Sequence, residues 1–159
     1  MLTITTCEDS LSKKLEPGAP PSSERFAAVR NLSAAGLFAG VVMTPVLPFL
    51  EDTKENVMGM VELAREAGAR FIYPMFGVTL RDRQREYFYS RLDRIFPDMG
   101  LRERYEKQYG ERYVCSSPKA GSLYRLLGEE CSKAGILYKM PDIIHSYKKN
   151  YQYEQLTLF

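Results

Sequence analysis

The chain has 159 residues, of which 45% are hydrophobic and 26% are charged, values that are ordinary for one globular domain with an apolar core. Its net charge of +2 is too small to indicate a nucleic-acid partner, and no run of about 18 apolar residues predicts a membrane span. The N-terminus lacks the pattern of a secretion signal, and the cysteines are odd in number and far apart. Both features predict a reducing, cytoplasmic location without a disulfide framework.

Along the chain, helix-like segments alternate with short apolar runs. Three of the helix-like segments end on Ala-Gly, and glycine just past a helix end can take the left-handed conformation that closes it. The apolar runs that follow are typical of buried strands, and a helix–glycine–strand series is typical of parallel α/β organisation. The pattern predicts strands over residues 2–6, 38–44 and 71–75, each followed by a helix.

Capping residues predict where several helices begin. Ser22 is a candidate N-cap for the first long helix, and Asp52 begins an Asp-x-x-Glu variant of the capping box for the next. Ser117, followed by proline, marks a later start. Between them, residues 82–96 have amphipathic spacing that stops at Pro97, which predicts a further helix.

The most informative stretch covers residues 3–48. A threonine-rich strand end leads to Glu16-Pro17-Gly18-Ala19-Pro20, then to Arg25, to a helix that closes on Ala35-Gly36, and to an apolar strand that ends at Thr44-Pro45. This order resembles the second half of the barrel in radical S-adenosylmethionine (radical SAM) enzymes of the spore photoproduct lyase and "DNA repair photolyase"-like group. The cysteine triplet that binds the cluster in those enzymes, spaced three then two residues apart, is absent here.

The resemblance implies a fold and a domain organisation. The implied fold class is α/β, a partial (half) TIM-like barrel with parallel βα units, followed by an α-rich C-terminal extension. The barrel half covers residues 1–97, the helical extension 98–150, and a loosely held tail 151–159. A complete eight-fold barrel typically needs about 250 residues, so this chain is too short to form one. Its first strand is then an unpaired edge, which predicts a homodimer or a strand-swapped oligomer.

The resemblance also implies an activity for the complete enzyme. There, a 4Fe-4S cluster and S-adenosylmethionine generate a radical that abstracts a hydrogen from substrate, and damaged DNA is the candidate substrate. This chain is then a fragment that contributes S-adenosylmethionine-binding surface. We expect it to bind no cluster or other metal, to hold no cofactor and to be inactive on its own.

Two strand ends supply candidate cofactor-binding residues. Strand alternation places Thr3 and Thr5 on one face, and the resemblance implies that such hydroxyls contact the ribose of S-adenosylmethionine. The alternative is that threonine simply favours strands. The resemblance places Thr44 and Pro45 in the adenosine pocket, whereas a plain strand stop explains the same residues equally well.

Arg25 is the fifth candidate for cofactor binding. It occupies the first turn of a predicted helix, where the helix dipole disfavours a cation, so an anionic partner is expected. One partner is Glu16, in a structural salt bridge. The other, implied by the resemblance, is the carboxylate of S-adenosylmethionine, which a planar guanidinium can bind with two hydrogen bonds.

An arginine block supplies candidate substrate-binding residues. Arg81, Arg83 and Arg85 lie near aromatic residues, and such a block can hold phosphates and stack on bases. Cys115 is a candidate hydrogen-atom donor near the substrate. Acidic residues interleave with the arginines, so a solvated mixed-charge helix is the alternative. His145 is predicted to lie on the surface.

The last five residues carry a separate signal. Gln155, Leu156, Leu158 and Phe159 resemble the pentapeptide that binds the bacterial sliding clamp, in which apolar anchors enter a groove while glutamine fixes the register. The alternative is a tail that buries its apolar residues against its own core. A non-enzymatic adaptor that acts through this tail is therefore the second functional hypothesis. A self-contained enzyme finds no support, because no phosphate-binding glycine loop or nucleophile–base motif is present.

Overall fold

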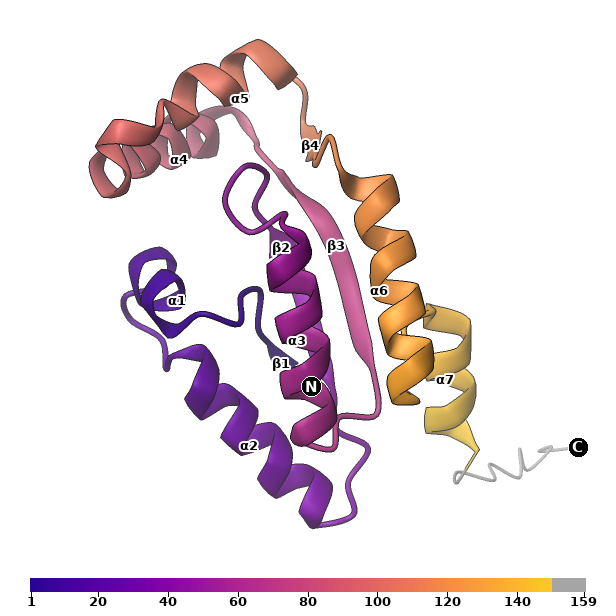
Figure 1. Cartoon of the computed structure of the whole chain (residues 1–159). Coiled ribbons are helices and arrows are strands. Elements are labelled where there is room, and N and C mark those ends of the chain that lie inside the picture. Colours follow the sequence, from indigo (N-terminus) through magenta and orange to yellow (C-terminus); the bar gives the residue numbers. More distant parts are fainter. Residues whose placement is uncertain (150–159) are drawn as a thin grey trace, which may run out of the picture.

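The computed structural model describes residues 1–149, apart from the side chain of Asp82. Helices and strands alternate over the first half of the chain, and helices dominate the second half (Figure 1). The elements are β1 (Leu2–Thr3), α1 (Asp9–Leu15), α2 (Ser22–Ala34), β2 (Val41–Val46), α3 (Lys54–Glu66), β3 (Ile72–Thr79), α4 (Asp82–Ile95), a short 3-10 helix η1 (Pro97–Met99), α5 (Leu101–Tyr109), β4 (Val114–Ser116), α6 (Ala120–Ala134) and α7 (Met140–Lys148).

The strands form one open sheet in the order β1-β2-β3-β4. β1 pairs with β2 in parallel, and β2 pairs with β3 in parallel, with Leu2, Val41 and Ile72 in one row. β4 is antiparallel to the end of β3. The predicted α/β class is therefore confirmed, with consecutive parallel strands joined by helical crossovers. The sheet is mixed and open, and its closure as half of a barrel stays a prediction.

Glycine closes the helices where the sequence predicts it. Gly36, Gly68 and Gly135 have φ angles of 78°, 68° and 68°, in the left-handed region that residues with a Cβ disfavour. The predicted helix over residues 82–96 is also confirmed, because α4 covers Asp82–Ile95. These features depend on local sequence, which is why the pattern alone predicts them.

Both predicted N-caps are wrong by one residue. Helix α2 begins at Ser22 itself, and the Ser22 hydroxyl donates to the Thr6 carbonyl at 2.6 Å. Helix α3 is capped by Thr53, whose Oγ1 accepts from the Asn56 N–H at 3.0 Å. Asp52 is thereby left to bond elsewhere in the structure, as described below.

The strand boundaries also differ from the prediction. β1 ends at Thr3, because Asn56 Nδ2 donates to the Thr5 carbonyl at 2.9 Å in place of a strand partner. β3 continues to Thr79, because its last residues pair with β4. The apolar run that follows Gly135 forms an isolated bridge, between Leu137 and Phe71, and no longer strand.

Helices cover one face of the parallel strands. Inward residues of α2, α3 and α6 pack against the buried side of β2 and β3 in a single core (Figure 1). Each fully buried aliphatic side chain stabilises such a core by about 1.5–3 kcal/mol. Its members include Phe26, Val29, Val41, Met43, Val57, Met60, Ile72, Phe76, Leu123 and Leu127.

The opposite face of the same strands is only partly covered. Thr3, Val42 and Tyr73 are neighbours in the strand register, and they alternate with the buried residues of their strands. Tyr73 and Met75 remain 36% and 37% exposed in the middle of β3. Parallel sheets are normally covered on both faces, so this sheet exposes a face that other parallel sheets bury.

A second apolar cluster lies beyond the carboxyl end of β3. It joins α4, α5 and β4 through Tyr89, Leu92, Leu101 and Tyr105, and it spans position 97, the predicted boundary between the two domains. Figure 1 shows α4 and α5 at one end of the molecule, beyond the strand ends.

Among residues 1–149, no helix is long and apolar enough to cross a membrane.

Candidate functional site at the carboxyl edge of the parallel strands

The loop that follows β2, residues 47–53, leads into α3 and lies against the segment that follows β1. In parallel α/β folds, ligands bind at this edge of the sheet, so the side chains there are the candidates for function. The loop brings two buried carboxylates, Glu51 and Asp52, next to the strand ends, and each is only 1% exposed.

Glu51 accepts hydrogen bonds on both carboxylate oxygens. Thr5 Oγ1 donates to Oε1 at 2.6 Å, and the Leu47 N–H donates to Oε2 at 2.8 Å. Burial raises the pKa of Glu51 to about 7; the bonds from Thr5 and Leu47 oppose this shift, and the nearby charges of Glu16 and Asp52 add to it. The carboxyl can therefore hold or release a proton near neutral pH.

Asp52 ties the loop to the second half of the chain. Its Oδ1 accepts from the Phe49 N–H at 2.7 Å, and its Oδ2 accepts from the Ser117 hydroxyl at 2.5 Å. Ser117 precedes α6, so this carboxylate joins the end of β2 to the start of that helix. A buried carboxylate is tolerated only when such directed bonds replace its hydration.

Asn56 completes the network from α3. Its Nδ2 donates to the carbonyls of Thr5 and Glu51, both at 2.9 Å, and its Oδ1 accepts from the Cys7 N–H at 2.9 Å. The side chain is buried, and its amide thus holds the chain after β1 against the loop after β2. Thr5 and Glu51 are fixed relative to each other at backbone and side chain alike.

Phe49 has a backbone conformation that is rare for a bulky residue. Its φ angle is 67°, in the left-handed region. The Phe49 N–H donates to Asp52, and the Phe49 ring packs edge-on against the Tyr105 ring with 5.3 Å between the ring centres. The Tyr105 hydroxyl in turn donates to the Pro48 carbonyl at 3.0 Å. Burial raises the pKa of Tyr105 well above its usual range. Residues whose rare backbone conformation is held by several surrounding contacts are found most often at functional sites.

The structure brings two of the four strand-end candidates into half-buried positions. Thr5 and Thr44 are half-buried at the carboxyl ends of neighbouring segments, whereas Thr3 and Pro45 are exposed. The Thr44–Pro45 peptide is cis, and the register between β2 and β3 shifts between Met43 and Val46. Thr5 is the one predicted residue that belongs to the buried network, through its bond to Glu51.

Arg25 pairs with Glu16, which confirms the structural partner predicted for it. The distance from Nη2 to Glu16 Oε2 is 2.6 Å, although this contact lacks the geometry of a directed hydrogen bond. Nε donates to the Pro20 carbonyl at 2.7 Å, and Nη1 donates to the Thr3 carbonyl at 2.8 Å. Because β1 is an edge strand, as predicted, Arg25 satisfies a carbonyl that faces away from the sheet.

The substrate-binding candidates lie in the second cluster, away from Glu51. Arg85 is buried, and its guanidinium donates to the carbonyls of Leu80, Gly110 and Arg112 at 2.6–3.3 Å, so it supports the connection between α5 and β4.

Arg81 and Arg83 are exposed, and the Arg81 guanidinium lies 5.6 Å from the centre of the Tyr113 ring. Cys115 is fully buried, so a contact with substrate requires this cluster to open. His145 is exposed on α7, as predicted.

Three residues of the network were missed or misassigned from sequence. Glu51 and Asn56 had no predicted role, and Asp52 was assigned as a helix cap. The available signal was the pair of adjacent acidic residues directly after the apolar segment 46–50, in a strand-end loop. Acidic residues next to an apolar strand are candidates for burial, but their partners lie far away in sequence.

The cysteines of the described residues are poor candidates for metal ligands. Among residues 1–149, no three His, Cys, Asp or Glu side chains come together in a way that could hold a metal ion. Burial raises the pKa of all three cysteines, that of Cys131 to about 12, which disfavours the thiolate that metals bind. Thr5 and Thr44 place two hydroxyls at half-buried positions near the strand ends.

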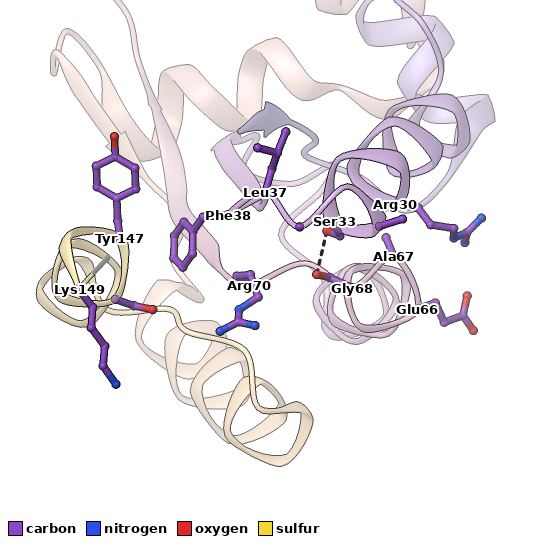
Figure 2. Close-up of a pocket in the computed structure, with 13 residues that line it drawn as sticks. Arg30, Ser33, Leu37, Phe38, Glu66, Ala67, Gly68, Arg70, Tyr147 and Lys149 are labelled. Atoms are coloured by element: carbon purple, nitrogen blue, oxygen red, sulfur yellow. Dashed lines mark hydrogen bonds between the residues drawn. The ribbon is translucent and has the colours of Figure 1, made fainter. Parts of the chain in front are cut away.

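A large cavity lies at the other edge of the sheet. Its volume is about 1180 Å³, and it is lined by the ends of α2 and α3, the residues that lead into β2 and β3, and α7. Figure 2 shows Phe38 and Arg70 near its middle, while Arg30 and Glu66 extend outward. The Ser33 hydroxyl donates to the Gly68 carbonyl at 2.9 Å beside it. Helix C-termini border this space, and the positive charges of Arg30, Arg70 and Lys149 oppose the negative ends of their dipoles.

Comparison with known proteins gives relatives without an assigned function. Uncharacterized proteins of Mycobacterium tuberculosis (Rv2578c and MT2655) and Mycobacterium bovis (Mb2609c) are each 32% identical to this chain over 103 residues. The match covers 65% of this chain but 30% of each relative, so the matched part spans less than a third of their length. No family model and no solved structure matches the chain.

The clamp-binding candidates lie outside the described residues. Gln155, Leu156, Leu158 and Phe159 all follow Lys149, the last residue that the structure describes. The hypothesis for this pentapeptide therefore rests on its sequence alone.

Proposed function

We propose that this chain is part of the barrel of a radical SAM enzyme of the spore photoproduct lyase and "DNA repair photolyase"-like group. Its carboxyl edge forms the nucleoside side of an S-adenosylmethionine pocket. The observation that carries the proposal is the exposed second face of consecutive parallel strands, which ends at half-buried hydroxyls.

The exposed face suits the interior of a barrel. In α/β barrels, helices cover the outside of the parallel strands and the inward side chains pack against strands from the other side. Here α2, α3 and α6 cover one face, and the other face carries Tyr73 and Met75 in the middle of β3. Further strands would bury these side chains. The mycobacterial relatives are longer than the matched part, which leaves room for such strands in proteins of this kind.

In this proposal, different residues bind different parts of the ligand. Thr5 and Thr44 lie at strand ends, where they suit the hydroxyls of a ribose. Arg25 suits the ligand's carboxylate, because its Nη2 has an ion-pair contact to Glu16 without a directed hydrogen bond. Glu16 is 43% exposed, and we propose that a ligand carboxylate takes its place beside Arg25. When bound in the complete enzyme, the cofactor supplies the radical chemistry.

A titration with two ligands tests the proposal. Although we expect this chain to retain no cofactor on its own, S-adenosylhomocysteine should bind it weakly and, at millimolar concentration, shift the NMR amide signals of Thr5, Thr44 and Arg25 in the ¹⁵N-labelled full chain. Arg25→Lys should lower the affinity for S-adenosylhomocysteine about tenfold, because lysine cannot make two parallel bonds to a carboxylate. The same variant should bind adenosine with unchanged affinity. No shift at these residues, or equal affinity of the variant for S-adenosylhomocysteine, overturns the assignment.

A DNA substrate belongs to the same proposal. Arg81 and Arg83 are exposed beyond the carboxyl end of β3, on the side where substrates of α/β barrels bind. Stacking of Arg81 with Tyr113 offers an aromatic and cationic surface of the kind that bases and phosphates contact. Damaged DNA, processed in the cytoplasm, is the substrate class that we propose.

The second candidate function is an adaptor that binds the sliding clamp through residues 155–159. The observation that favours it is the match of all its anchor types in a single terminal pentapeptide. Deletion of the pentapeptide from the full chain should abolish clamp binding and leave the response to S-adenosylhomocysteine unchanged. A synthetic tail peptide that fails to bind the clamp at micromolar concentration removes this candidate.

A further inference from the structure

We propose that Glu51 is a positioning residue that sets the direction of the hydrogen bond between Thr5 and a hydroxyl of the ligand. Glu51 does not touch the ligand in this arrangement and acts through Thr5. The inference rests on the proposed function, because it requires a ribose at the carboxyl edge. The group it recognises is a hydroxyl, which both donates and accepts.

The contacts of Glu51 fix where the Thr5 proton lies. A threonine hydroxyl has one proton and two lone pairs. When Glu51 is ionised, Thr5 Oγ1 donates that proton to Oε1 at 2.6 Å. The half-buried Thr5 then presents only lone pairs to a ligand, and the ligand hydroxyl must be the donor.

Protonation of Glu51 reverses this direction. The other oxygen, Oε2, accepts from the Leu47 N–H at 2.8 Å, whereas a proton on Oε1 has the Thr5 oxygen as its acceptor, so we place the added proton on Oε1. Oε1 then donates to Thr5 Oγ1, and the Thr5 proton becomes free to point at the ligand. The same pair of side chains therefore offers an acceptor in one state and a donor in the other.

The surroundings of Glu51 make both protonation states accessible near neutral pH. The titratable groups that face it are Asp52 from its own loop, Glu16 from the α1–α2 connection, and Tyr105 from α5. Glu16 is itself paired with Arg25. Burial and these carboxylates raise the pKa of Glu51 to about 7. The bonds of Asp52 and Asn56 hold the loop while the proton moves.

Fluorinated nucleosides distinguish the two directions. Adenosine hydroxyls suit either state, whereas fluorine can accept but cannot donate. The experiment titrates the ¹⁵N-labelled full chain with adenosine and with its 2′-fluoro and 3′-fluoro analogues. It is done at about pH 5.5 and about pH 8.5, on either side of the pKa of about 7.

The readout is a ratio: the affinity for adenosine divided by the affinity for the analogue that carries fluorine at the contacted position. We expect it to rise about tenfold from the lower to the higher pH, the effect of one lost hydrogen bond. Glu51→Gln should give the low-pH ratio at both pH values, because its amide N–H donates to Thr5 while its carbonyl accepts from Leu47. Any effect of fluorine on sugar conformation is the same for every variant and cancels.

Control variants separate positioning from a purely structural role. Glu66→Gln, an exposed change on α3, should keep the wild-type pH dependence. Thr5→Ser should also keep it, because serine retains the hydroxyl, and Thr5→Val should remove it. These two variants test the inference even if Glu51→Gln does not fold.

The outcomes separate this inference from the proposed function. If adenosine binds at Thr5 and the ratio is the same at both pH values, the role of Glu51 is overturned and the nucleoside pocket stands. If adenosine shifts no signal at the carboxyl edge at either pH, the proposed function is overturned and this inference fails with it.

Discussion

The two edges of the parallel strands differ in what they bury. At the carboxyl edge, two carboxylates and an amide are buried and bonded to named partners, and the loop that carries them includes a left-handed phenylalanine. At the amino edge, a cavity of about 1180 Å³ is lined largely by helix ends and exposed charged side chains. The larger space and the more specialised chemistry thus lie at opposite edges.

Cavity volume and buried charge therefore indicate different edges of this fold as the candidate site. Burial of a carboxylate costs several kcal/mol, and its bonds must offset that cost. Glu51 and Asp52 incur it at the edge where parallel α/β proteins bind ligands. The charged residues of the amino edge, such as Arg30 and Glu66, stay exposed and incur no such cost. The predictions below compare matched substitutions at the two edges.

The largest effect is expected from Asp52→Ala. The change leaves the Phe49 N–H and the buried Ser117 hydroxyl without their acceptor, so we expect a loss of about 3 kcal/mol in the free energy of unfolding. Glu66→Ala at the amino edge should change it by less than about 0.5 kcal/mol. Urea denaturation measures both. A loss below about 1 kcal/mol for Asp52→Ala would contradict the structural role given to this network.

The second prediction concerns pH. Burial raises the pKa of folded Glu51 to about 7 from its ordinary value of 4.5, so the folded state holds a proton that the unfolded state releases. Protonated Glu51 therefore contributes to the free energy of unfolding. This contribution is fully present below about pH 4.5 and is lost as the pH rises through about 7, by up to about 3 kcal/mol. Glu51→Gln should remove this slope, and Glu66→Gln should keep it. Parallel slopes for all three proteins between those pH values count against a buried, titrating Glu51.

A smaller effect is expected from the two strand-end threonines. Thr5→Val removes the donor to Glu51 and should cost about 1–2 kcal/mol, whereas Thr3→Val, at an exposed site, should stay within about 0.5 kcal/mol. Thr5→Val should also raise the pKa of Glu51 further, because the Thr5 bond opposes the shift. Urea denaturation and NMR titration of the Glu51 carboxyl carbon test these points. Equal losses for both variants would show that Thr5 has no special partner.

The sequence predicts the features that depend on neighbouring residues. The α/β class, the glycine-closed helices and α4 all follow from spacing within one segment. The candidate site depends instead on contacts across the chain, because Thr5 and Glu51 are 46 residues apart and Asp52 and Ser117 are 65 apart. Asp52 illustrates the limit: it has the residue type and the spacing of a helix cap, yet Thr53 caps α3 and Asp52 bonds to Ser117.

The position of a bound nucleoside tests the central claim most directly. A crystal structure of the full chain soaked with adenosine should show the ribose within hydrogen-bond distance of Thr5 Oγ1, at the carboxyl edge beside Thr44. Adenosine in the cavity between Phe38 and Arg70, with the carboxyl edge empty, would contradict the claim that the buried carboxylates mark the functional edge.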